Sequence, residues 1–159
     1  TLFRSLIHIY LQQGFFMWLV SLVLIFAISS DTPAELGFLA AAGTALWCLG
    51  MFFETVGDWQ LSRFRGNPDN AGRVMDRGLW RYTRHPNYFG EACVWVGLFA
   101  IAMENPAAII TVVSPAMMLW VLMGPLGKGL LERRMSKKRP EFAEYARRTS
   151  GFFPLPPKS

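Results

Sequence analysis

The stretch Gly78-Leu79-Trp80-Arg81-Tyr82-Thr83-Arg84-His85-Pro86-Asn87-Tyr88-Phe89-Gly90-Glu91 is followed directly by an apolar run that ends at Met103. Proline is favoured in the first turn of a helix, where its missing N–H costs no hydrogen bond. The sequence therefore predicts a helix from Pro86 to Met103, with Arg84-His85 leading into it.

The start of this predicted helix combines features that suit a phosphate group. The first N–H groups of a helix are unpaired and carry its positive dipole, and Arg81 and Arg84 lie beside them in sequence. Asn87 and Glu91 are four residues apart and share one face of the helix. A glutamate this close to an apolar segment indicates a role other than stability.

Long uncharged runs decide the class of protein. The 159-residue chain is 52% hydrophobic, and its length suits one domain, 1–159. Residues 5–30 and 105–127 carry no Asp, Glu, Lys or Arg, and 36–53 is a shorter run of the same kind. Because about 20 apolar residues cross a bilayer, these runs indicate an integral membrane protein.

The basic residues define a topology. All sixteen Lys and Arg fall at Arg4, in 63–84 or in 128–158, whereas the connections at 31–35 and around Glu104 carry only acids. The positive-inside rule then places both termini and the 63–84 loop in the cytoplasm, in a bacterial inner membrane. Topology accounts for the net charge of +5 better than nucleic-acid binding does.

These observations predict an all-α fold, a multi-pass membrane helix bundle. We expect four transmembrane helices and a short interfacial helix over 140–148. The expected spans are 6–29, 36–60, 86–103 and 107–131.

Polar residues recur near the cytoplasmic ends of the predicted helices, in blocks 54–65, 81–91 and 128–145. Three helix ends that meet on one face can form a pocket for a large polar cofactor, with an apolar interior that accepts a lipophilic substrate. Cys48 and Cys93 make no metal-binding pattern, and no Rossmann glycine motif is present. We therefore expect no metal site.

The stretch from Gly78 to Glu91 resembles the signature of the steroid 5-alpha-reductase and sterol reductase superfamily, and is most similar to its bacterial branch. Further matching segments are Asp58-Trp-Gln with Arg65, Ser114-Pro115, Leu130-Leu-Glu132-Arg and Tyr145-x-x-Arg148-Thr-Ser-x-Phe-x-Pro154-x-Pro-Pro-Lys158. The resemblance covers the cofactor-binding C-terminal part of the superfamily. Its earlier helices, which carry the substrate-polarising residues, are expected to be missing, so no catalytic residue is assigned.

The resemblance implies an NADPH-dependent reductase of a carbon–carbon double bond in an apolar lipid or steroid-like molecule. Asp58 and Arg65 match residues that bind NADPH, and Asn87 and Glu91 match residues near its nicotinamide and ribose. The other residues expected at this cofactor site are Glu54, Trp80, Arg84, His85, Tyr88, Lys128 and Glu132.

Two other functions stay open. Isoprenylcysteine carboxyl methyltransferases share a similar Arg-His-Pro-x-Tyr core and bind S-adenosylmethionine there, so a membrane methyltransferase is one alternative. The Asp58–Arg65 block favours the reductase, which needs it. The other alternative is a truncated, non-catalytic membrane subunit.

Overall fold

A computed structural model describes residues 2–30, 36–125 and 127–158, so the expected connection at 31–35 lies outside the described residues. The described residues form helices and no strand. The α-helices are α1 (Leu2–Ser29), α2 (Phe38–Gly66), α3 (Pro86–Ala102), α4 (Val113–Met123), α5 (Lys128–Lys138) and α6 (Phe142–Arg148), and the 3-10 helices are η1 (Pro68–Asn70), η2 (Gly78–Arg81) and η3 (Pro106–Val112).

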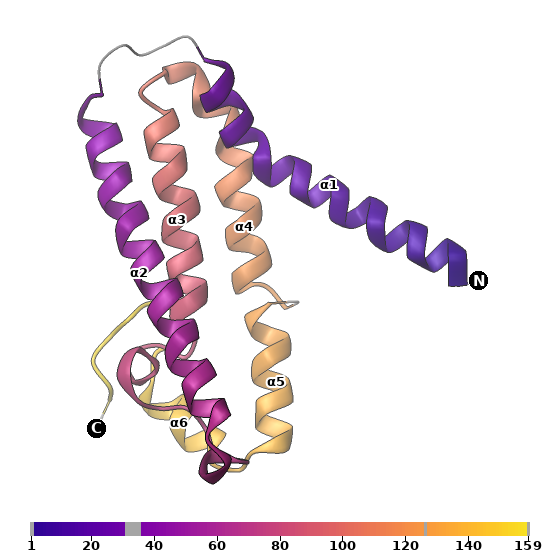
Figure 1. The fold of residues 1–159 in the computed structure, drawn as a ribbon, viewed down its shortest axis with the longest axis vertical. Helices are drawn as coiled ribbons and strands as arrows, with labels where there is room; N and C mark the ends of the chain where they lie inside the picture. Colours follow the sequence, from indigo (N-terminus) through magenta and orange to yellow (C-terminus); the bar gives the residue numbers. More distant parts are fainter. Residues whose placement is uncertain (1, 31–35, 126, 159) are drawn as a thin grey trace.

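Helices α2, α3 and α4 lie side by side along the long axis of the molecule, and α5 continues beyond α4 (Figure 1). In the part of the chain that the structure describes, three segments are long and apolar enough to cross a membrane: Leu6–Ser29, Phe38–Gly66 and Pro106–Lys138. Helix α3 has 17 residues, the lower limit of about 17 for a spanning helix. The expected all-α membrane bundle is confirmed.

Glycines on α2 and α3 allow these two helices to touch through their backbones. A Cβ atom added at Gly43 would lie 2.6 Å from the Gly97 carbonyl oxygen, and one at Gly50 would lie 2.6 Å from that of Gly90. These glycines repeat every seven residues, so they fall on one seam of each antiparallel helix. Only a residue without a side chain fits there, and the contact fixes the register of α2 against α3.

Helix α1 bends where a side chain of α4 enters its hydrogen-bond ladder. The Ser114 hydroxyl accepts from the Val23 N–H (3.2 Å) and donates to the Leu19 carbonyl (2.9 Å), the two groups that would pair in an unbroken helix. Such an insertion is a recognised cause of helix kinks. Beyond it, the N-terminal half of α1 turns away from the bundle (Figure 1).

The expected span over 107–131, which the sequence interrupts at Ser114-Pro115 and Gly124-Pro125, lies within the candidate span Pro106–Lys138 and is built from three helical segments. Residues 106–112 form η3, α4 ends at Met123, and α5 begins only at Lys128. Pro125 has no N–H to donate and restricts the preceding Gly124, which caps α4 with extended backbone (ψ 179°). The expected short C-terminal helix is present as α6.

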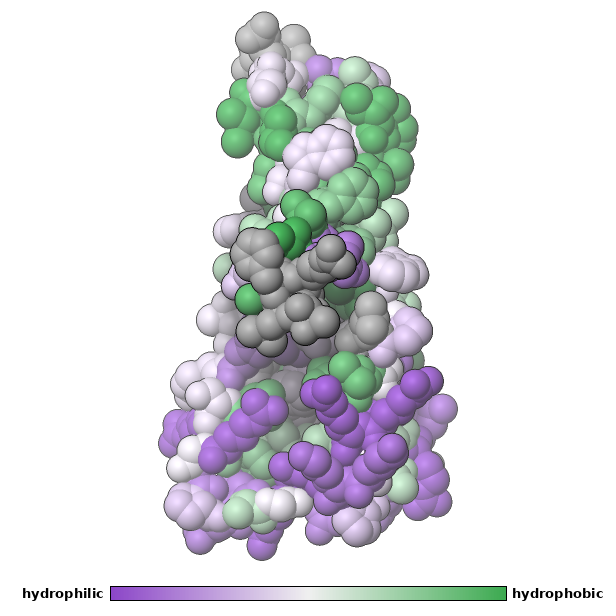
Figure 2. All heavy atoms as spheres, turned by 90° about the vertical axis from the view of Figure 1, so that its right-hand side faces the viewer, coloured by the Kyte–Doolittle hydropathy of each residue, from purple (hydrophilic) through white to green (hydrophobic). Residues whose placement is uncertain are grey.

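The polar and apolar halves of the molecule are separated along its long axis. On the face turned toward the viewer in Figure 2, hydrophobic residues cover the upper part and hydrophilic residues the lower part. At the apolar end, a Glu104 carboxylate oxygen accepts a hydrogen bond from the Ala40 N–H (2.6 Å). An acid from the α3–η3 turn thus satisfies an unpaired donor in the first turn of α2.

The seam between α2 and α3 gives a first testable prediction. Replacing Gly50 with Ala should destabilise the protein by about 1–3 kcal/mol, because the added methyl group forces two backbones apart. Gly14→Ala is the matched control, since a Cβ there meets nothing within 4 Å. Thermal unfolding in detergent should show a clear loss for Gly50→Ala and no loss for the control. Equal stability of the two variants would contradict backbone contact at this seam.

The membrane topology gives a second prediction. Single cysteines replacing Ala107 and Ala143, both exposed, should react with a membrane-impermeant maleimide from opposite sides of the membrane. The background is a variant in which Cys48 and Cys93 are replaced by serine. The basic residues place Ala143 on the cytoplasmic side. Labelling of both positions from one side would reject the topology.

Candidate functional site

The segment before α3 is held in place by the C-terminal tail. The Arg84 N–H donates to the Ser150 carbonyl (2.9 Å), and Thr83 and Ser150 form a parallel β-bridge. The buried Thr83 hydroxyl donates to the Phe152 carbonyl (2.8 Å). These bonds fix the residues that precede Pro86, the first residue of α3, as the sequence predicts.

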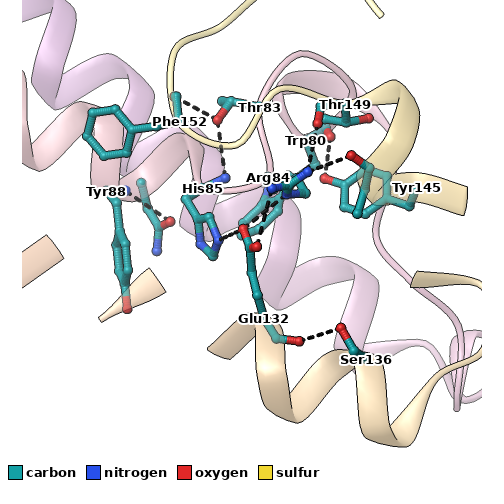
Figure 3. A network of polar contacts seen from close by, with 12 residues as sticks. Trp80, Thr83, Arg84, His85, Tyr88, Glu132, Ser136, Tyr145, Thr149 and Phe152 are labelled. Atoms are coloured by element: carbon teal, nitrogen blue, oxygen red, sulfur yellow. Dashed lines mark hydrogen bonds and ion pairs between the residues drawn. The ribbon is translucent and has the colours of Figure 1, made fainter. Parts of the chain in front are cut away.

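Arg84 is the centre of the polar network in Figure 3. Its Nε and Nη2 donate to the two carboxylate oxygens of Glu132, at 3.0 and 3.2 Å. Its Nη1 donates to the carbonyls of Ala146 (2.6 Å) and Thr149 (3.0 Å). One guanidinium therefore joins the start of α3 to α5, to α6 and to the segment that follows α6. Paired, charge-assisted bonds of this kind are among the stronger polar contacts.

His85 lies beside this ion pair and lines the same site. Its Nε2 is 3.0 Å from Glu132 Oε1, so one carboxylate oxygen contacts both Arg84 and His85. The His85 ring is buried and stacks on the Tyr88 ring, with centroids 5.3 Å apart and planes at 17°. The stack gives the site a flat aromatic wall on the first turn of α3.

Trp80 connects α2 and α6 to the same site. Its indole N–H donates to the Gly57 carbonyl (3.0 Å), and its own carbonyl accepts from the Tyr145 hydroxyl (2.6 Å). Burial raises the pKa of Tyr145, which keeps this hydroxyl protonated and able to donate. Each buried polar group here has a partner, so η2 cannot shift without breaking a bond.

The contact between α2 and α3 brings two of the predicted residues together. The Asn87 side-chain amide donates to Asp58 Oδ1 (3.0 Å), and its carbonyl oxygen accepts from the Tyr88 N–H (3.1 Å). Asn87 is thus held with its amide toward α2. Glu54 and Glu91 lie one turn deeper in the same two helices.

These elements enclose a cavity of about 440 Å³ at the hydrophilic end of the bundle. Eight of the eleven predicted site residues line it: Asp58, Arg65, Trp80, Arg84, His85, Asn87, Tyr88 and Glu132. Glu54, Glu91 and Lys128 are not among the lining residues. Lys128 instead lies against Gly151, beside the Arg84 guanidinium.

Other cavity residues were not predicted as site residues. Met75, Met135 and Phe142 supply an apolar wall, and Arg139 adds a cation. Neither Arg65 nor Arg139 forms an ion pair with another described residue, in contrast to Arg84. Arg81 is exposed and does not line the cavity. The cavity can therefore hold a molecule that has both anionic and apolar parts.

The described residues contain no group of three or more His, Cys, Asp or Glu side chains placed to bind a metal ion.

The chain matches a family model described as "Protein of unknown function (DUF1295)" over residues 1–149. It is 29% identical over 142 residues to the nickel-cobalt-cadmium resistance protein NccN of Alcaligenes xylosoxydans xylosoxydans, covering 89% of this chain and 63% of the relative. It is 34% identical over 111 residues to the cobalt-zinc-cadmium resistance protein CzcN of Cupriavidus metallidurans, covering 69% and 48%.

The chain also has a shorter match, to a steroid dehydrogenase. It is 35% identical over 60 residues to 3-oxo-5-alpha-steroid 4-dehydrogenase 1 of Bos taurus, covering 38% of this chain and 23% of the relative. The chain spans less than two thirds of the length of each of these three proteins. No solved structure matches it.

The Arg84–Glu132 pair gives a third prediction. Glu132→Gln keeps the side-chain shape but removes the charge, and should cost about 1.5–3 kcal/mol of stability, since the Arg84 guanidinium loses its charged partner and one of two acceptor oxygens. Asp76→Asn is the control. It breaks the exposed Arg148–Asp76 pair (2.7 Å) and should cost only about 0–1 kcal/mol. Thermal unfolding compares the two, and equal losses would show that Arg84 does not hold these elements together.

Proposed function

We propose that this protein is an NADPH-dependent membrane reductase. The chain belongs to the DUF1295 family, and this family is related to steroid 5-alpha-reductase. Its substrate would be a carbon–carbon double bond in an apolar lipid or steroid-like molecule. The observation that carries this proposal is a cavity that joins the Asp58–Asn87 pair, two cations with no ion-pair partner among the described residues, and an apolar wall.

The chemistry of the cavity residues fits a dinucleotide. Arg65 and Arg139 would bind its phosphates, as charge-assisted donors that no described carboxylate neutralises. Asp58 would accept hydrogen bonds from hydroxyl groups, and Asn87 offers both a donor and an acceptor to a carboxamide. The bound cofactor would supply the hydride, while these residues hold and orient it.

The network around Arg84 would position the walls of this site. Its guanidinium makes four hydrogen bonds to protein groups, so it has little donor capacity left for a phosphate. We therefore assign Arg84 and Glu132 to holding α5 and α6 against the start of α3. Phosphate binding is assigned instead to Arg65 and Arg139.

The substrate would reach the site from the apolar side of the bundle. Tyr88 lines the cavity and also packs against the cluster of Ala92, Leu122 and Phe152 between α3, α4 and the tail. It thus stands at the border between the polar cavity and the membrane-embedded helices. A lipophilic molecule that approached between α3 and α4 would meet the cofactor at this residue.

The names of the two bacterial relatives refer to metal resistance. The reductase proposal uses residues that are present in the cavity.

A fourth prediction tests cofactor binding at Arg65. Arg65→Ala should weaken NADPH binding roughly ten- to hundredfold, because one charge-assisted contact contributes about 1.5–3 kcal/mol. If Arg65 contacts the 2′-phosphate, NADH binding should fall much less. Arg63→Ala is the matched control, since this exposed arginine of α2 does not line the cavity.

Calorimetric titration of the purified chain with NADPH, NADH and S-adenosylmethionine separates the alternatives. Equal losses of affinity for NADPH and NADH in Arg65→Ala would show that Arg65 does not contact the 2′-phosphate. Tight binding of S-adenosylmethionine with no dinucleotide binding would replace the reductase by a methyltransferase.

A further inference from the structure

Helix α5 has two faces of different character. A helix turns by about 100° per residue, so Glu132 and Met135 fall on one side of α5, and Arg139 directly follows the end of the helix. All three line the cavity. The rest of the helix surface carries Arg133, Arg134, Lys137 and Lys138, which are all exposed and do not line the cavity.

The four cations of this second face, which we call the α5 cationic face, are not neutralised within the described protein. None of them forms an ion pair with a described residue. The acid of the helix, Glu132, faces the other way and is paired with Arg84. The α5 cationic face therefore presents four positive charges to its surroundings.

The position of this face along the molecule indicates what those charges meet. Helix α5 follows α4 in the same direction (Figure 1), and α4 exposes Trp120 and Met123 at its end. Leu130 and Leu131, both partly exposed, come next, and the cations follow. Exposed aromatic and apolar residues that are followed by cationic ones are typical of a segment that crosses a membrane surface. Figure 2 shows hydrophilic residues below the apolar part of this side.

The geometry of α5 brings these charges back toward the membrane. Side chains of a helix tilt toward its N-terminus, which for α5 is the end nearer α4. From Lys128, the first residue of α5, to Arg133 the rise is about 8 Å at 1.5 Å per residue, and the long side chains shorten the distance to the headgroups. Clusters of four or more Lys or Arg next to a spanning helix attract anionic lipid.

We propose that the α5 cationic face, formed by Arg133, Arg134, Lys137 and Lys138, binds the headgroup of an anionic phospholipid in the leaflet next to it. Binding on this face does not depend on which cofactor the cavity takes, because none of the four residues lines the cavity.

The test measures lipid binding to the full chain in neutral detergent by native mass spectrometry, with dioleoyl phosphatidylglycerol and dioleoyl phosphatidylcholine as probes. Phosphatidylglycerol should bind at least about tenfold more tightly, since each cation near an anionic headgroup contributes about fivefold. Replacing all four cations with Gln should remove that preference. Replacing four other exposed arginines, Arg73, Arg77, Arg81 and Arg147, changes the net charge equally and should leave the preference within about threefold.

Several results would overturn the proposal. The unmodified chain could bind the two lipids equally, the two quadruple variants could lose the preference for phosphatidylglycerol equally, or the variant of the α5 cationic face could keep that preference unchanged. Competition by glycerol phosphate separates a lipid site from a site for soluble phosphate esters, and displacement at the affinity of the lipid itself would also overturn it. Both variants change only exposed residues, so their unfolding temperatures should match the unmodified chain.

Discussion

The backbone contact between α2 and α3 is the constraint on which the rest of the structure depends. At Gly50 and Gly90 the helices approach so closely that neither position accepts a Cβ atom. Such packing suits a membrane, where apolar side chains gain little by leaving lipid and close van der Waals contact drives association. Because the contact fixes the register of two antiparallel helices, it also decides which polar residues meet at their ends. Asp58 meets Asn87 for that reason.

The Arg84 network is the second constraint, and it builds on the first. The glycine seam places the start of α3 beside α2, and Arg84 then ties α5 and α6 to that point. Burying such a charge costs several kcal/mol, which the paired carboxylate and two carbonyls offset. A network in which every member is paired specifies one arrangement of its elements. Hydrogen bonds and an ion pair therefore define the walls of the cavity, whereas close packing defines the apolar part of the helix bundle.

The features that the sequence could predict are those encoded locally. Uncharged runs indicate the spanning helices, and Pro86 marks the start of α3. The sequence also allowed polar residues near the same ends of different helices to be grouped, and most of these predicted site residues line one cavity. The Arg84–Glu132 pair joins positions 48 residues apart, and only the folded chain shows that Arg84 is already engaged. The seven-residue glycine repeat was a readable signal for the α2–α3 seam, and the break at Pro125 follows from its chemistry.

Helix α5 lies between the polar cavity and the surface of the membrane. It begins within a few residues of the end of α4, and its cavity face carries Glu132 and Met135. Any displacement of α5 along or away from the membrane would act directly on the Arg84–Glu132 bonds. Those bonds are directional and charge-assisted, so they favour the position that α5 takes in the structure. The charges on its outer face and the lining of the cavity are consequently two properties of one helix.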